Sequence, residues 1–74
     1  MNDAPKVKKF SGAKITEARV ACELTKVDLA GMVGCTDMSI YNWETGRFFP
    51  DAESLAELSA ALGKPVEWFF VEME

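Results

Sequence analysis

The sequence predicts a compact all-α domain of five helices. Three observations lead to this fold class: apolar residues recur at three- and four-residue steps, residues that commonly cap helix N-termini precede these stretches, and glycines follow them. The chain has 74 residues, 49% of them hydrophobic, which is enough for one domain with one core. We therefore expect a folded domain over residues 11–74, preceded by residues 1–10 as an N-terminal arm.

The arm combines Pro5 with three lysines and shows no helical spacing of apolar residues. A proline and clustered like charges at a chain end are typical of a solvated segment, so we expect a flexible basic arm. The first helix follows over residues 12–22, with Ser11 available as its N-cap. Its apolar stripe consists of Ile15, Ala18 and Cys22.

The second helix is expected over residues 26–33. Thr25 and Asp28 can form a capping box, in which each side chain accepts a hydrogen bond from the other residue's backbone N–H. Gly34 supplies the left-handed conformation that ends a helix without a Cβ clash. The inner face of this helix consists of Leu29, Ala30 and Val33.

The third helix is expected over residues 37–44, with Thr36 as N-cap and Gly46 closing it. Ile40 and Trp43 form a narrow apolar seam, which leaves most of the helix surface outside the core. The residues on the outside are Asp37, Met38, Ser39, Tyr41 and Asn42.

Two more helices complete the prediction. Asp51 caps a fourth helix over residues 52–62, which Gly63 ends, and Pro65 begins a short fifth helix over residues 65–70. The apolar side of the fourth helix consists of Leu55, Leu58, Ala61 and Leu62.

Composition excludes several function classes. The chain contains no histidine and only two cysteines, so it lacks the usual zinc ligands and the usual general base. Cys22 and Cys35 fall where a small apolar residue would serve, and we expect buried free thiols. We expect no metal site, no cofactor, no small-molecule substrate and no enzymatic activity. Residues 66–71 are too short for a membrane span and residues 1–9 lack the apolar run of a signal peptide, so we expect a cytoplasmic protein.

Charge is distributed unevenly along the chain. The formal net charge is −4, but residues 1–26 carry six basic groups against three acids, whereas residues 27–74 carry two basic groups against nine acids. The average charge argues mildly against a nucleic-acid partner. The asymmetry leaves room for a positive face.

The pair of short helices around Gly34 is the most informative unit, because a tight glycine-containing turn between two helices is typical of the helix-turn-helix motif. Further characteristic segments are ITEAR at 15–19, Leu29-Ala30, SIYNWETGR at 39–47, Pro50, Leu62-Gly63 and VEWFF at 66–70. With these segments, residues 12–70 resemble the Cro/CI-type helix-turn-helix family, also called the XRE family, to which phage repressors belong.

The resemblance implies a lambda-repressor-like fold and sequence-specific binding of double-stranded DNA, with the helix over 37–44 in the major groove. The candidate base contacts are Asp37, Met38, Ser39 and Asn42. Asn42 can pair bidentately with adenine, Asp37 can accept from cytosine, and Met38 can touch a thymine methyl group. In the alternative interpretation these side chains are merely solvated, and Asp37 serves only the helix dipole.

The candidate phosphate contacts are Thr25, Lys26, Thr36 and Arg47. Lys26 stands where the family commonly carries glutamine, and either side chain can reach a phosphate at the N-terminus of the second helix. Arg47 comes directly after the third helix, although it could also be an ordinary loop charge. The basic arm could likewise be a solvated tail or reach DNA.

Two other features concern the family's fold and assembly. The resemblance implies an internal salt bridge between Arg19 and Glu44, with a phosphate contact as the alternative for Arg19. The sequence also holds an aromatic cluster made up of Phe48, Phe49, Trp68, Phe69 and Phe70. If part of the cluster is exposed, it suggests a homodimer on an inverted-repeat operator; if all five rings close the core, it has no such meaning.

The sequence therefore predicts a DNA-binding transcriptional regulator, with repression as the expected sign. The alternative is a protein-interaction module, antitoxin-like or a regulatory partner, that keeps the fold without reading DNA. The acidic balance of the chain and Asp37 on the third helix motivate this alternative.

Overall fold

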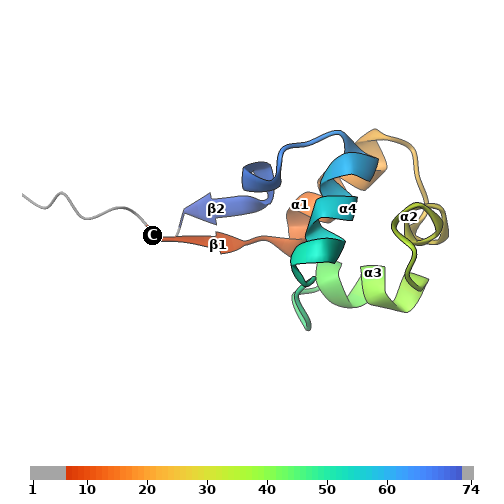
Figure 1. The fold of residues 1–74 in the computed structure, drawn as a ribbon, viewed down its shortest axis with the longest axis horizontal. Helices are drawn as coiled ribbons and strands as arrows, with labels where there is room; N and C mark the ends of the chain where they lie inside the picture. The colour runs from red at the N-terminus through yellow and green to blue at the C-terminus, as the bar shows by residue number, and fades with distance from the viewer. Residues whose placement is uncertain (1–6, 73–74) are drawn as a thin grey trace, which may run out of the picture.

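The structure is a computed structural model that describes residues 7–72. Its elements run in the order β1 (Lys8–Phe10), α1 (Gly12–Ala21), α2 (Lys26–Val33), α3 (Asp37–Glu44), α4 (Ala52–Leu62), the 3-10 helix η1 (Val66–Phe69) and β2 (Phe70–Glu72). Figure 1 shows the four α-helices gathered together, with β1 and β2 side by side and projecting away from them. The four α-helices predicted from the sequence are confirmed, and their bounds agree to within one residue.

Local caps define the α-helices. Thr25 Oγ1 accepts from Asp28 N, and the Asp28 carboxylate accepts from Thr25 N, each at 3.0 Å, so the predicted capping box is present. These bonds hold the pKa of Asp28 below its usual value. Thr36 caps α3 in a similar way, accepting from Ser39 N at 3.1 Å. Ser11 occupies the N-cap position of α1, but its side chain makes no capping hydrogen bond.

One apolar core joins all four α-helices and η1. Leu29 of α2, Ile40 of α3 and Leu58 of α4 are fully buried, and Phe69 of η1 is buried with them. Among residues 7–72, the buried apolar residues of the core are Ile15, Ala18, Leu29, Ala30, Ile40, Trp43, Leu58, Leu62 and Phe69. Ala30 of the inner face of α2 and Trp43 of the apolar seam of α3 both belong to this set, as predicted.

The predicted fifth α-helix over residues 65–70 is wrong. Residues Val66–Phe69 form a single 3-10 turn, and Phe70 begins β2. The Phe69 side chain is completely buried, and the Phe69 carbonyl accepts a hydrogen bond from Ser11 N at 2.8 Å. A continued α-helix would use that carbonyl internally and would carry Phe70 away from the strand that it pairs with. Residues 7–72 therefore form four α-helices and a small two-stranded sheet, not five helices.

The sheet joins the two ends of the described chain. β1 and β2 pair antiparallel in the register Lys8↔Glu72, Lys9↔Val71 and Phe10↔Phe70. Lys8–Phe10, expected as part of the flexible arm, are thus ordered by strand pairing and by the Phe10 ring, whose centroid lies 5.7 Å from that of Phe70. Residues 1–6 of the predicted arm lie outside the described residues.

Both cysteines are free, as expected, but the prediction that both are buried is wrong. Cys22 follows the last residue of α1 and is exposed, because α1 ends before its apolar stripe reaches this position. Cys35 is half-buried between α2 and α3, and burial raises the pKa of its thiol. Within residues 7–72, no helix is long and apolar enough to cross a membrane.

Candidate nucleic-acid interface

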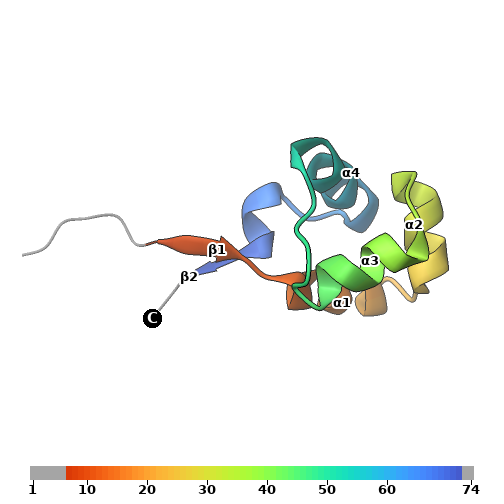
Figure 2. The ribbon, with the colours of Figure 1, turned by 90° about the horizontal axis from the view of Figure 1, so that it is seen from below.

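The helices α2 and α3 form a compact two-helix motif. Gly34 ends α2 with a left-handed backbone, φ 82°, and its N–H donates to the Ala30 carbonyl at 2.8 Å. Cys35 N donates to the same carbonyl at 3.0 Å, so the turn is held by two backbone hydrogen bonds. α3 then runs along the outside of the molecule, at the bottom of Figure 1 and nearest the viewer in Figure 2.

The two faces of α3 differ sharply in exposure. Ile40 and Trp43 are buried against the other helices, whereas Met38 is 61% exposed and Tyr41 is 50% exposed. Of the predicted base contacts, Asp37 and Met38 are exposed, and Ser39 and Asn42 are half-buried. All four therefore belong to one eight-residue helix whose opposite face anchors it in the core.

The hydroxyl groups of Thr36 and Ser39, at the beginning of α3, take part in the N-terminal cap of this helix. Thr36 Oγ1 accepts from Ser39 N and lies 3.1 Å from Ser39 Oγ. A hydroxyl group has one donor hydrogen and two acceptor lone pairs, so one hydrogen of this pair stays available to an acceptor such as a phosphate or a base edge. The pair is thus preorganised as a donor at the N-terminus of α3.

Asp37 is the first residue of α3 and is exposed. Its carboxylate has no hydrogen-bond or salt-bridge partner within residues 7–72. At this position it interacts favourably with the positive end of the helix dipole. The same charge repels the phosphates of any DNA that approaches it.

The predicted phosphate contacts lie at the ends of the two helices. Thr25 is the N-cap of α2 and Lys26 its first residue, while Arg47 lies in the segment after α3. The Asn42 carbonyl accepts from Arg47 N at 3.0 Å, which holds the beginning of this segment against the end of α3. The exposed Arg47 guanidinium lies over the Phe48 ring, with its Cζ 5.6 Å from the ring centroid.

Arg19 and Glu44 form an ion pair between α1 and the last residue of α3. Arg19 Nε donates to Glu44 Oε2 at 2.7 Å, and the two side chains are only 11% and 7% exposed. Arg19 Nη1 also donates to the Leu24 carbonyl at 2.9 Å, in the link between α1 and α2. These contacts engage the guanidinium inside the domain, and they position α3 relative to α1 and to the beginning of α2.

Comparison with a family model fits this geometry. Residues 15–69, from within α1 to the end of η1, match the model of the helix-turn-helix family. The chain belongs to this family. The resemblance to Cro/CI-type regulators inferred from the sequence is confirmed, and α3 is the second helix of the motif.

The chain is similar in sequence to a known regulator and in structure to solved proteins. A protein of Rhodospirillum rubrum, described as an uncharacterized transcriptional regulator in the ATPase CF(0) region, is 30% identical over 63 residues, and the chain spans 58% of its length. The P22 c2 repressor, in a crystal structure with a synthetic operator, is 28% identical with a TM-score of 0.79 over 82% of this chain and 92% of that one. The clp gene regulator ClgR of Corynebacterium glutamicum is 28% identical with a TM-score of 0.74, over 78% and 62% respectively.

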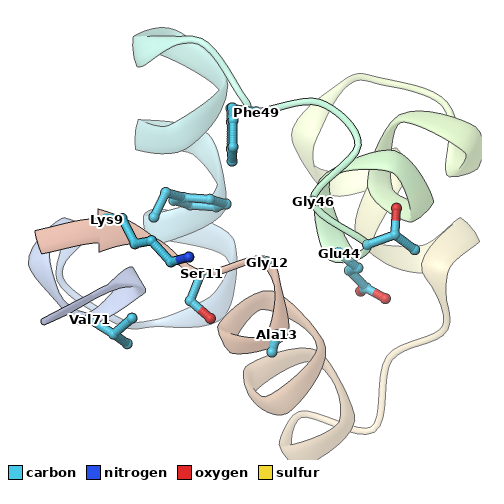
Figure 3. Close-up of a pocket in the computed structure, with 10 residues that line it drawn as sticks. Lys9, Ser11, Gly12, Ala13, Glu44, Gly46, Phe49 and Val71 are labelled. Atoms are coloured by element: carbon cyan, nitrogen blue, oxygen red, sulfur yellow. The ribbon is translucent and has the colours of Figure 1, made fainter. Parts of the chain in front are cut away.

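Only part of the predicted aromatic cluster is buried in the core of this helix-turn-helix domain. Phe69 is fully buried, whereas Phe48 is 55% exposed and Phe49 is 66% exposed. Phe49 packs edge-on against Phe10, with 6.2 Å between the ring centroids. Both line a pocket of about 420 Å³, which Figure 3 shows between β1, the beginning of α1 and the segment after α3.

Tyr41 is the one large exposed side chain of α3 that sequence reasoning placed outside the core but gave no role. The available signal was its spacing, three residues after Met38, which puts both side chains on the same side of a helix. The structure therefore adds Tyr41 to the set of outward residues on the second helix of the motif.

Proposed function

We propose that this chain binds double-stranded DNA sequence-specifically as a transcriptional regulator, with α3 in the major groove. The observation that carries the proposal is α3 itself, a short helix anchored by Ile40 and Trp43 whose opposite face stays exposed. An α-helix fits the major groove of B-DNA, where base edges differ most from one another. The structural similarity to a repressor crystallised with operator DNA supports the same use of the fold.

The outward side of α3 supplies candidates for base contacts: Asp37, Met38, Ser39 and Asn42. Asn42 lies one turn after Met38, so both can face the same groove. The Asn42 side chain can pair with adenine N6 and N7, and the exposed thioether of Met38 can pack on a thymine methyl group. Asp37 can accept from cytosine N4, at the cost of repulsion from nearby phosphates.

Contacts with the DNA backbone are assigned to Thr25, Lys26, Thr36 and Arg47. Lys26 stands at the N-terminus of α2, where free backbone N–H groups and the helix dipole favour an anion. Arg47 carries an exposed positive charge directly after α3. Such contacts set affinity and its salt dependence but carry no sequence information.

We further propose that two copies bind together on an inverted repeat and act as a repressor. Phe48 and Phe49 are exposed on the same domain, and large exposed apolar residues suggest a protein contact. A symmetric dimer would place two α3 helices roughly 34 Å apart, which matches successive major grooves.

The second candidate function is a protein-interaction module of the antitoxin-like or regulatory-partner type. The observation that favours it is the Asp37 carboxylate on α3, which has no partner among residues 7–72, together with a net charge of −4. A negatively charged surface is unfavourable beside phosphates and suits a basic protein partner instead.

The deciding experiment is selection of random duplexes by the purified protein, followed by sequencing, at two salt concentrations. Asn42→Ala should blur the enriched sequence, because it removes a base contact. Arg47→Ala should weaken binding to all sequences and lower its salt dependence, and Arg47→Lys is the matched control because it keeps the charge. An enriched inverted repeat supports the dimer. Absence of enrichment, with negligible binding at low salt, would reject DNA binding in favour of the protein-interaction module.

A further inference from the structure

We propose that Met38 and Tyr41 form an apolar surface that reads thymine methyl groups, so that each operator half-site carries A·T pairs beneath α3. This inference rests on the proposed function, because it requires α3 to enter the major groove. It names the chemical feature of the DNA that the helix recognises, and it adds Tyr41 to the residues that determine specificity.

The exposure of the two side chains is the first support. Met38 and Tyr41 are 61% and 50% exposed, and they are the two large apolar residues of α3 that lie outside the core. They are three residues apart on α3, so their side chains are neighbours on one face of the helix. Ile40 and Trp43 hold the opposite face in the core.

Neither side chain makes a hydrogen bond or a ring contact within the described residues. Within residues 7–72, the Tyr41 hydroxyl and the Met38 sulfur make no hydrogen bond, and the Tyr41 ring makes no aromatic or cation–π contact. Leaving such side chains in water forgoes the free energy that their burial would provide. A ligand that covers them would recover that free energy.

The charges of α3 restrict which base edges it can read. The most common contact to guanine is a bidentate arginine or lysine on O6 and N7, and α3 contains neither residue. Its charged side chains are Asp37 and Glu44, and Glu44 is occupied by Arg19. The guanine edge would therefore meet no cation from this helix.

Thymine offers the complementary chemistry. Its C5-methyl group is the apolar feature that distinguishes a base pair in the major groove, and methionine and aromatic side chains pack well on it. Asn42 suits the adenine edge, which belongs to the same type of base pair. The apolar pair and the amide thus favour A·T pairs on one helix.

Replacing thymine with deoxyuridine tests this inference, because it removes only the methyl group and keeps base pairing. The operator obtained by selection is synthesised with uracil at each thymine in turn, and its affinity is measured with the unmodified protein. We expect a loss of about fourfold for each methyl group that the protein buries, the factor that corresponds to one buried methyl group. Uracil in the flanking duplex is the matched control and should change nothing.

Protein variants then assign the effect to its side chains. In Met38→Ala and in Tyr41→Ala, the uracil penalty should disappear at the thymine beneath the missing side chain. Tyr41→Phe should keep the penalty, because the ring and not the hydroxyl makes the contact. Both positions are on an exposed helix face, and circular dichroism checks that each of the three variants is folded.

Three results would overturn the inference. If uracil at every thymine leaves the affinity unchanged while specific binding persists, thymine methyl groups are not read, and the proposed function still stands. If the penalty persists unchanged in both alanine variants, other side chains read the methyl groups. If no duplex is enriched and the exposed pair serves a protein partner, the proposed function fails and this inference fails with it.

Discussion

Gly12, the first residue of α1, lies in direct contact with the backbone of Trp43 near the end of α3. A Cβ atom on residue 12 would overlap the Trp43 carbonyl oxygen and would lie only 2.7 Å from the Glu44 carbonyl oxygen. These are backbone atoms of a helix and cannot rotate away. Together with the Arg19–Glu44 ion pair, this contact sets how closely α1 approaches the end of α3.

Gly12→Ala should destabilise the domain, because the added methyl group must push α1 and α3 apart. Overpacking of this kind costs about 1–3 kcal/mol. Urea unfolding followed by tryptophan fluorescence measures the change in the free energy of unfolding. A midpoint equal to that of the unmodified protein would show that α1 and α3 can move apart without loss of stability. The contact would then not set the distance between the two helices.

Gly31→Ala should have the opposite effect, and it is the matched control for the first substitution. Gly31 lies inside α2, is exposed, and has open space where its Cβ would be. Alanine loses less backbone entropy than glycine when a helix forms, so we expect about 0.5–1 kcal/mol of stabilisation. The same urea experiment checks this; a lower midpoint would contradict it.

Arg19→Ala or Glu44→Gln should each cost about 3–5 kcal/mol, because either change leaves a charge in a largely buried place without its partner. Replacing both residues with methionine should restore much of the stability, since no charge then remains to be desolvated. A double-mutant cycle in thermal unfolding, built from Arg19→Met, Glu44→Met and the variant that carries both, separates the pair's interaction from the single losses. A double variant whose loss of stability equals the sum of the two single losses would contradict the coupling.

Asp51→Asn should make the stability of the domain less dependent on pH at the acid end. Ser54 N donates to the Asp51 carboxylate at 2.8 Å, and this bond holds the pKa of Asp51 below its usual value. A carboxyl group with a lowered pKa stabilises the fold above its unfolded pKa of about 3.9, and this contribution disappears as the pH falls through the folded pKa. Asparagine caps the helix without titrating.

The measurement is the melting temperature of both proteins between pH 2 and pH 7. The unmodified protein should be the more stable of the two at pH 7, and its advantage should shrink below about pH 4. Asp28 titrates with a lowered pKa in both proteins, so only the difference between the two curves reports on Asp51. A difference that stays constant with pH would show that the charge does not contribute to the cap.

Local chemistry allowed the sequence alone to determine the four α-helices and the outward face of α3. Thr25, Thr36 and Asp51 cap helices through hydrogen bonds to residues three positions away, and Gly34 and Gly63 end them through their own backbone conformation. These interactions span at most a few residues, so the local sequence is enough to predict where each helix begins and ends. The exposure of Met38 followed in the same way from the narrow seam of Ile40 and Trp43.

Contacts between distant segments decided the rest. The pairing of Phe10 with Phe70 spans nearly the whole described chain, and it turned a predicted helix into the 3-10 turn η1 and strand β2. The close approach of Gly12 to Trp43 and the exposure of Phe49 also depend on how elements pack against one another. Neither periodicity nor capping carries this information, because the free energy of such contacts depends on the positions of all the elements at once.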